Sequence, residues 1–140
     1  DVCSSDLIEQ EINNILGELV NFQLALEMDG KNINCYIVYD NDNFWPIELT
    51  SGMEKFISSL AIRTSLINIS SLPKPNFLVI DEGLGNLDSD VLTEFAGFLN
   101  YLESQFTFVI MISHIEAARD MVKSLIEISK VNGFSKIDYV

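Results

Sequence analysis

The sequence predicts an α/β domain, a mixed sheet with flanking helices. The short apolar run from Phe77 to Ile80 is typical of a strand buried on both faces, and the run from Phe106 to Ser113 of a second buried strand. Apolar residues at helical spacing lie between them: Val91, Leu92, Phe95, Ala96, Leu99 and Leu102. With 140 residues, 48% of them hydrophobic, the chain is long enough for one domain with a core of its own.

The charge balance limits the partners that the chain can bind directly. Its formal net charge is −13, and affinity for a phosphate backbone comes from Lys and Arg, so we expect a poor independent DNA binder. Any contact with nucleic acid would come from local patches or from other parts of an assembly. The apolar runs are too short to cross a bilayer and no secretory signal is visible, which predicts an intracellular protein without a membrane partner.

The first twenty residues divide into two parts. Residues 1–7, Asp-Val-Cys-Ser-Ser-Asp-Leu, resemble the translated tail of a sequencing adapter, and we interpret them as such an artefact. The alternative is that they are genuine residues, with Ser4 or Ser5 capping a helix. Residues 8–20 follow with a seam of apolar residues spaced four, three and four apart: Ile8, Ile12, Ile15 and Leu19. This spacing fits the end of a coiled coil, and an ordinary amphipathic helix fits it as well.

Two segments show the alternation of β-hairpins. Residues 22–27 and 33–39 alternate around an Asp29-Gly30 turn, and residues 124–130 and 134–140 flank Asn132-Gly133.

A helix from Ser51 to about Ser71 is predicted by a capping box. Ser51 stands at the N-cap and Glu54 three residues later, so each side chain can bond the other's backbone N–H. The N-terminus of such a helix, with Gly52 allowing close approach, could bind an anion. An ordinary capped helix is the simpler interpretation of this motif alone.

The central strand ends in two adjacent carboxylates, Asp81 and Glu82, which are costly to bury without a cation or strong donors. Ligands bind at the carboxyl ends of parallel strands, so the pair is typical of a Walker B strand. Asp81 would then hold Mg²⁺, directly or through water, and Glu82 would polarise the attacking water. A strand that ends in a solvated acidic turn is the alternative. His114, the only histidine, ends the second buried strand, and a short helix is expected from Ile115 to about Lys123.

Taken together and in this order, the motifs resemble the C-terminal lobe of the ABC-type ATPase head of SMC-like proteins. The sequence Asp81-Glu82-Gly83-x-Gly85-x-Leu87-Asp88 is similar to the SbcC branch, which includes ATPase subunits of phage and viral recombination nucleases. The resemblance covers residues 8–140: the end of a coiled-coil helix over 8–20 and the head lobe over 21–140.

The resemblance implies a role for each matching residue. Ser51, Gly52 and Glu54 match the signature motif, which holds the γ-phosphate of ATP bound to the opposite head. Asp81 matches the metal residue, Glu82 the catalytic base and His114 the switch histidine. Leu87 and Asp88 match the D-loop, which crosses the interface between heads.

The sequence departs from the family pattern in two ways. Thr50 replaces the usual Leu and Met53 the usual second Gly of the signature motif, and the Met53 side chain could alter how closely the partner's nucleotide docks. No G-x-x-x-x-G-K-[ST] occurs in the sequence. In the family this loop lies on an N-terminal lobe at the far end of the coiled coil, so the chain resembles a truncated reading frame. A half-head of this kind should expose apolar surface and be poorly soluble.

The resemblance therefore implies an ATP- and Mg-dependent ATPase that works with a nuclease in double-strand-break repair or recombination. The expected partners are the N-terminal lobe of the same polypeptide, a second identical head, a nuclease subunit, and double-stranded DNA through the assembly. ATP hydrolysis would require the first two partners. A structural SMC-type ATPase that tethers DNA is one alternative. A metal-dependent hydrolase that uses Asp81, Glu82 and His114 directly is another.

Overall fold

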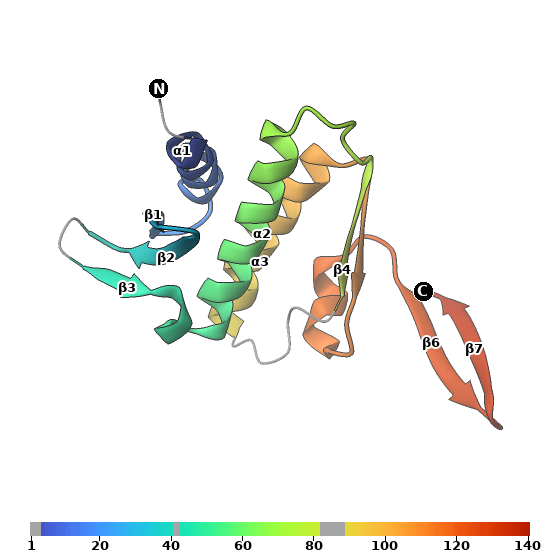
Figure 1. Cartoon of the computed structure of the whole chain (residues 1–140). Coiled ribbons are helices and arrows are strands. Elements are labelled where there is room, and N and C mark those ends of the chain that lie inside the picture. The colour runs from blue at the N-terminus through green and yellow to red at the C-terminus, as the bar shows by residue number, and fades with distance from the viewer. Residues whose placement is uncertain (1–3, 41–42, 82–88) are drawn as a thin grey trace.

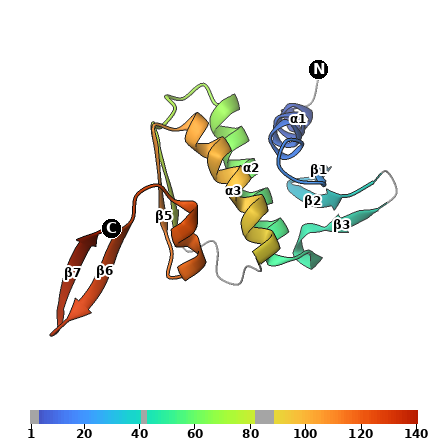
Figure 2. The same cartoon turned by 180° about the vertical axis from the view of Figure 1, so that it is seen from behind.

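The computed structural model describes residues 4–40, 43–81 and 89–140, without the side chains of residues 4, 89–94 and 117. Helices α2 (Gly52–Ile69) and α3 (Ser89–Gln105) lie side by side in the middle of the molecule. Helix α1 (Ser4–Leu16) and a small sheet lie on one side of them, and strands β4 (Phe77–Asp81) and β5 (Phe108–Ile112) on the other (Figures 1 and 2). The predicted α/β class is confirmed.

The described strands form three separate sheets. Strands β1 (Gln23–Asp29), β2 (Asn32–Val38) and β3 (Phe44–Pro46) make an antiparallel sheet in that order. Strands β4 and β5 are parallel, and β6 (Ile126–Val131) and β7 (Phe134–Tyr139) form an antiparallel hairpin. Both predicted hairpins are present, and Gly30, Asn132 and Gly133 have the positive φ angles that tight turns require. Strand β3 was not predicted from the sequence.

Helix α1 differs from the predicted helix over 8–20. It begins at Ser4 and ends at Leu16, and a turn follows in which the N–H groups of Leu19 and Val20 both bond the carbonyl of Leu16 at 2.9 Å. Its residues Ile12, Ile15 and Leu16 are buried in the core of the lobe. The apolar seam therefore serves the lobe itself over this stretch.

Helix α2 begins at the predicted capping box, ends at Ile69 and is buried along much of its length. Its buried residues include three polar ones, Ser58, Thr64 and Ser65. The hydroxyls of Thr64 and Ser65 donate to the carbonyls of Leu60 and Ala61, at 2.9 and 2.6 Å. The buried hydroxyl of Ser58 has no hydrogen-bond partner.

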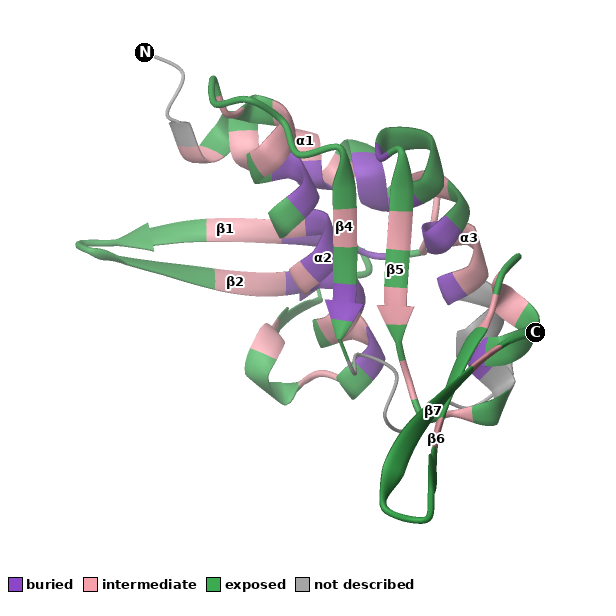
Figure 3. Ribbon diagram, turned by 90° about the vertical axis from the view of Figure 1, so that its right-hand side faces the viewer, coloured by how far each residue is buried: buried purple, intermediate pink, exposed green. Residues whose placement is uncertain are grey.

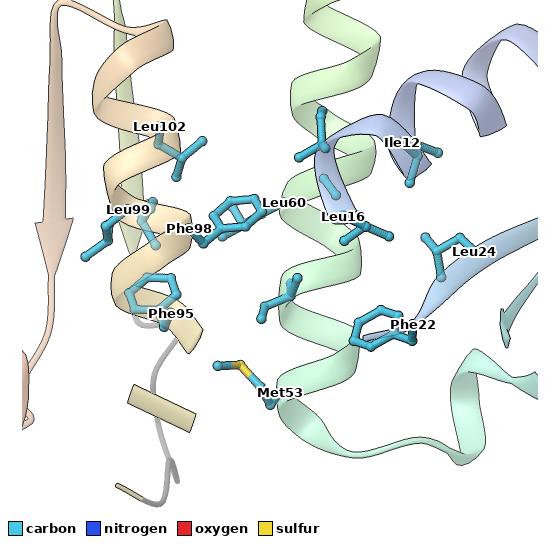
Figure 4. Packing of buried hydrophobic residues seen from close by; sticks show 14 of the residues in the cluster. Ile12, Leu16, Phe22, Leu24, Met53, Leu60, Phe95, Phe98, Leu99 and Leu102 are labelled. Atoms are coloured by element: carbon cyan, nitrogen blue, oxygen red, sulfur yellow. The ribbon is translucent and has the colours of Figure 1, made fainter. Parts of the chain in front are cut away.

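The core fills the space on both sides of α2 (Figure 4). Residues of α1 and β1, such as Leu16 and Leu24, pack on one side, and α3 supplies the other. Of the predicted α3 stripe, Phe95, Leu99 and Leu102 are buried; the side chains of Val91 and Leu92 lie outside the described residues. Phe98, which the predicted stripe omits, is also fully buried.

The prediction that the central strand is buried on both faces is wrong. In β4, Ile80 is buried, whereas Phe77 and Val79 are 47% and 46% exposed. Strand β5 shows the same alternation along its length (Figure 3). The helices cover one face of this pair, and nothing among the described residues covers the other.

Strand β5 is shorter than predicted, and the helical segment after it is a 3-10 helix, which winds more tightly than an α-helix. Strand β5 is Phe108–Ile112 rather than 106–113, and the expected helix over 115–123 is the 3-10 helix η2 (Glu116–Met121). A second 3-10 turn, η1 (Ile47–Leu49), leads from β3 into α2. The hairpin β6–β7 projects from the lobe, with Ile128 and Tyr139 exposed (Figure 3).

The unpartnered hydroxyl of Ser58 generates a stability prediction. Burying a hydroxyl without a partner costs about 1–3 kcal/mol, and alanine also favours a helix. Ser58→Ala should therefore raise the free energy of unfolding by about 1 kcal/mol in urea titrations. Ser65→Ala is the matched control. Its free energy of unfolding should rise less than that of Ser58→Ala, because the substitution also removes the hydrogen bond from Ser65 to the carbonyl of Ala61. A loss of stability in Ser58→Ala would contradict the packing described.

Candidate functional site

The N-terminus of α2 has the geometry that the sequence predicts. The backbone N–H of Ser51 donates to Glu54 Oε2 at 2.6 Å, and Ser51 Oγ accepts from the N–H of Glu54 at 3.2 Å. The Ser51 hydroxyl keeps its own proton to donate, and the first N–H groups of a helix have no partner within the helix. Ser51 and Gly52 are exposed, and a Cβ at Gly52 would meet nothing within 4 Å. An anion could therefore approach this end closely.

The two departures from the signature pattern have structural explanations. The Thr50 hydroxyl donates to the carbonyl of Ile47 at 2.8 Å and closes the turn before α2. The Met53 side chain is only 7% exposed and points into the core between α2 and α3 (Figure 4). The expected effect of Met53 on the docking of a partner's nucleotide stays a prediction.

The strand ends bring Asp81 and His114 to one edge of the parallel pair. Strand β4 ends at Asp81, which is paired in register with Ile112, the last residue of β5. His114 follows two residues later, and both Asp81 and His114 are exposed. The carboxyl ends of parallel strands are where ligands bind in α/β folds. The predicted neighbours Glu82, Leu87 and Asp88 lie outside the described residues.

The two groups of predicted site residues share one end of the lobe. Helix α2 starts at the end where β4 and β5 finish, and α3 starts there too (Figure 1). Within the part of the chain that the structure describes, no group of three His, Cys, Asp or Glu residues could hold a metal ion. A single carboxylate such as Asp81 still fits Mg²⁺, which keeps several waters and binds substrate phosphates.

The sequence did not indicate a groove beside the free edge of β5. Its volume is about 790 Å³, and it lies between β5, η2 and β6. Its apolar lining includes five exposed residues, namely Phe108, Ile110, Ile112, Ile126 and Ile128. The sequence did hold one signal for this groove. The continuous apolar runs of β4 and β5 predict strands buried on both faces, whereas the described part of the lobe covers only one face of the pair. Of the described helices, none is both long and apolar enough to span a bilayer.

The capping box can be tested by replacing its members. Ser51→Ala removes the acceptor for the Glu54 N–H and should lower the free energy of unfolding by about 0.5–2 kcal/mol. Glu54→Gln can still bond the Ser51 N–H through its amide oxygen and should cost less than Glu54→Leu. Urea unfolding followed by circular dichroism measures all three. Equal stability of the Gln and Leu variants would show that the Glu54 side chain does not cap the helix.

Comparison with known proteins gives similarity over most of the chain. No protein-family profile matches. An uncharacterized protein of Acanthamoeba polyphaga mimivirus, R555, is 40% identical over 94% of this chain and 11% of its own length. The SbcC component of the nuclease SbcCD is 29% identical in Pseudomonas aeruginosa, over 96% of this chain, and 30% identical in Bacillus subtilis, over 74%. The matches cover 11% and 10% of those two proteins, so the chain spans about a tenth of the length of these relatives.

Solved structures of SMC heads have the same fold. One of them gives a TM-score of 0.79 at 17% identity; it comes from work on the ATP-driven dimerization and DNA-stimulated activation of SMC ATPases. It matches 98% of this chain and 85% of its own. The SMC head domain of Thermotoga maritima gives a TM-score of 0.69 at 23% identity, over 98% of this chain and 48% of its own. The chain therefore has the fold of the C-terminal lobe of an SMC-like ABC ATPase head, and it is similar in sequence to the SbcC component of SbcCD nucleases.

Proposed function

We propose that the chain is the C-terminal half of an ATP-binding and ATP-hydrolysing head that works with a nuclease in DNA double-strand-break repair or recombination. Similarity to the SbcC component of the nuclease SbcCD supports the repair role. The chain spans about a tenth of those relatives, so we propose the activity for the head as a whole and not for this chain alone. Its place of action would be intracellular.

The observation that carries this proposal is the parallel pair β4–β5, whose ends hold Asp81 and lead to His114. Asp81 would hold Mg²⁺, directly or through water, and Glu82 would orient and polarise the attacking water. His114 would contact the γ-phosphate of ATP. The ion would offset the charge of the phosphates when bound.

The capped end of α2 would act on a different nucleotide, bound to a second head. Ser51 can donate its hydroxyl proton to a phosphate oxygen while Glu54 fixes the Ser51 backbone. Gly52 leaves room for a partner surface to approach. Leu87 and Asp88 would lie at the interface between the two heads. ATP held between two heads would close them, and hydrolysis would reopen them.

The groove beside β5 would receive the N-terminal lobe of the same polypeptide. Parallel strands are normally covered on both faces, and a bare strand edge invites pairing with another strand. Among the described strands β5 pairs only with β4, and Phe108, Ile110 and Ile112 are between 46% and 49% exposed. An added strand and its covering helices would bury them. That lobe would also bring the G-x-x-x-x-G-K-[ST] loop.

The remaining partners would be a nuclease subunit and double-stranded DNA held by the assembly as a whole. The net charge of −13 supports an indirect contact with DNA. A DNA-tethering SMC-type ATPase is the second candidate, and the match to solved SMC heads favours it. Dependence of ATP hydrolysis on a bound nuclease subunit and on DNA ends would favour the repair enzyme.

The ATPase proposal is tested by co-expressing the chain with an N-terminal lobe of a family member that carries the phosphate-binding loop. The chain alone should not hydrolyse ATP, and the pair of lobes should. Glu82→Gln should lower the rate by about 100-fold or more, because it removes the base while keeping the shape. Glu116→Gln, which changes an exposed carboxylate on η2, is the control and should leave the rate unchanged. Hydrolysis by the chain alone, or full activity of Glu82→Gln, would refute the proposal.

The docking of the N-terminal lobe is tested separately at the groove. The chain alone should elute partly as aggregates in size-exclusion chromatography, and co-expression with the N-terminal lobe should make it soluble. Ile110→Lys should abolish co-purification of the two lobes, because a charge would be buried in the groove. Ile33→Lys, at an isoleucine that is 59% exposed on the β1–β2 hairpin, should not. Elution of the chain alone entirely as a soluble monomer would contradict this prediction.

A further inference from the structure

The outer edge of β1 lies along α1 and is bonded to it by side chains. β1 is an edge strand of its sheet, and an edge strand presents unpaired N–H and C=O groups that need partners. In β1 these groups belong to Leu24 and Leu26, which alternate with the residues that face β2. No strand lies on that side among the described residues.

Two side chains of α1 satisfy three of these four groups. The Asn13 amide donates to the carbonyl of Leu24 and accepts from the Leu24 N–H, both at 2.8 Å. Glu9 Oε2 accepts from the N–H of Leu26 at 2.6 Å. The Asn13 amide thus takes the place of the peptide group of a neighbouring strand.

The spacing of these contacts fixes the axial position of the helix. Four residues of a helix rise about 6 Å, and two residues of a strand rise about 6.8 Å, so Glu9 and Asn13 match Leu26 and Leu24 as α1 and β1 run in opposite directions. The Asn13 amide can donate and accept at Leu24 at the same time, whereas an ionised carboxylate such as Glu9 can only accept. A slip of α1 by one turn would place the Glu9 carboxylate against the Leu24 carbonyl, where two acceptors would face each other. The contacts therefore specify one register.

Helix α1 is bonded directly to one end of α2 and is connected to the other end through the sheet. Glu11 Oε1 accepts from the side-chain amide of Asn68, near the C-terminus of α2, at 3.0 Å. At the other end, β1 pairs with β2, β2 pairs with β3, and β3 leads through η1 to Ser51. Backbone hydrogen bonds as far as β3, and then the chain itself, thus connect the edge held by Asn13 to the capped turn of α2.

We propose that Glu9 and Asn13 form a latch that sets the register of α1 on the lobe and joins α1 to the capped N-terminus of α2. Displacement of α1 along its axis is then passed through the sheet to Ser51 and Glu54. Asn13 and Glu9 are positioning residues and need no contact with a ligand. The latch does not depend on the chain being an ATPase.

The test is amide hydrogen exchange in the full chain. Asn13→Ala removes both bonds to Leu24, and exchange of the Leu24 N–H should rise by about tenfold or more. Asn14→Ala is the matched control, since Asn14 is the next residue and is exposed. Equal exchange at Leu24 in the two variants would overturn the latch.

A second pair of variants keeps the test valid if Asn13→Ala unfolds the chain. Glu9→Gln retains an acceptor for the Leu26 N–H, so exchange of that N–H should stay close to the rate in the unaltered chain. Glu9→Leu should raise exchange at Leu26 by about five- to tenfold. If the Gln and Leu variants exchange alike at Leu26, Glu9 is not part of a latch.

The link to α2 has its own readout in the same spectra. In Asn13→Ala, or in Glu9→Leu if the former unfolds, the N–H of Glu54 should also exchange faster, because the turn that carries Ser51 is held through the sheet. The matched variant, Asn14→Ala or Glu9→Gln, should leave it unchanged. Faster exchange at β1 without any change at Glu54 would overturn the proposed coupling.

Discussion

The position of α2 between two packed layers is the constraint on which the rest of the lobe depends. Core residues of α2 contact α1 and β1 on one side and α3 on the other. The buried polar residues of α2 are small ones, serine and threonine, which take little space between the layers. A helix buried on two sides has few ways to rotate or shift without opening a cavity. Both predicted site regions follow from this: the start of α2 is exposed at one end of the lobe, and the strands beyond α3 end there.

The parallel pair β4–β5 shows the opposite condition, because only half of its apolar surface is covered. Alternate residues of β4 and β5, such as Ile80, pack toward the helices, and Val79 and Ile110 face outward at 46% exposure each. Phe77 and Phe108 stack across this open face, with ring centroids 5.5 Å apart. An apolar face of this kind is expected to recruit a cover, and the free edge of β5 gives that cover a template for pairing.

The capping box and the contacts of α1 use the same chemistry for different purposes. In each, a side-chain oxygen or amide satisfies backbone groups that secondary structure leaves without partners. At Ser51 the bonds are local and hold the first turn of one helix. At Asn13 the bonds join two residues that are eleven positions apart in the sequence, Asn13 and Leu24, and hold one helix against a sheet.

The sequence by itself determined the elements whose signals are local. The capping box at Ser51 and Glu54, the turns at Gly30 and Gly133, and the strand that ends at Asp81 all depend on neighbours within a few residues, and all are found near the predicted positions. The C-terminal lobe of an SMC-like head also followed from the order of these motifs. The roles assigned to Glu82, Leu87 and Asp88 remain predictions.

Tertiary structure decided what depends on distant contacts. Strand β3 forms because β2 offers it an edge, and its three residues carry too little pattern to be recognised alone. Helix α1 covers Ser4 to Leu16 because Ile12 and Leu16 are buried against the lobe, which heptad spacing cannot specify. Met53 turns into the core because α3 packs beside α2. The sequence could not predict the open face of β4–β5, because that face also depends on distant contacts. An apolar run shows that a strand is suited to burial, and only the packed lobe shows which of its faces is uncovered.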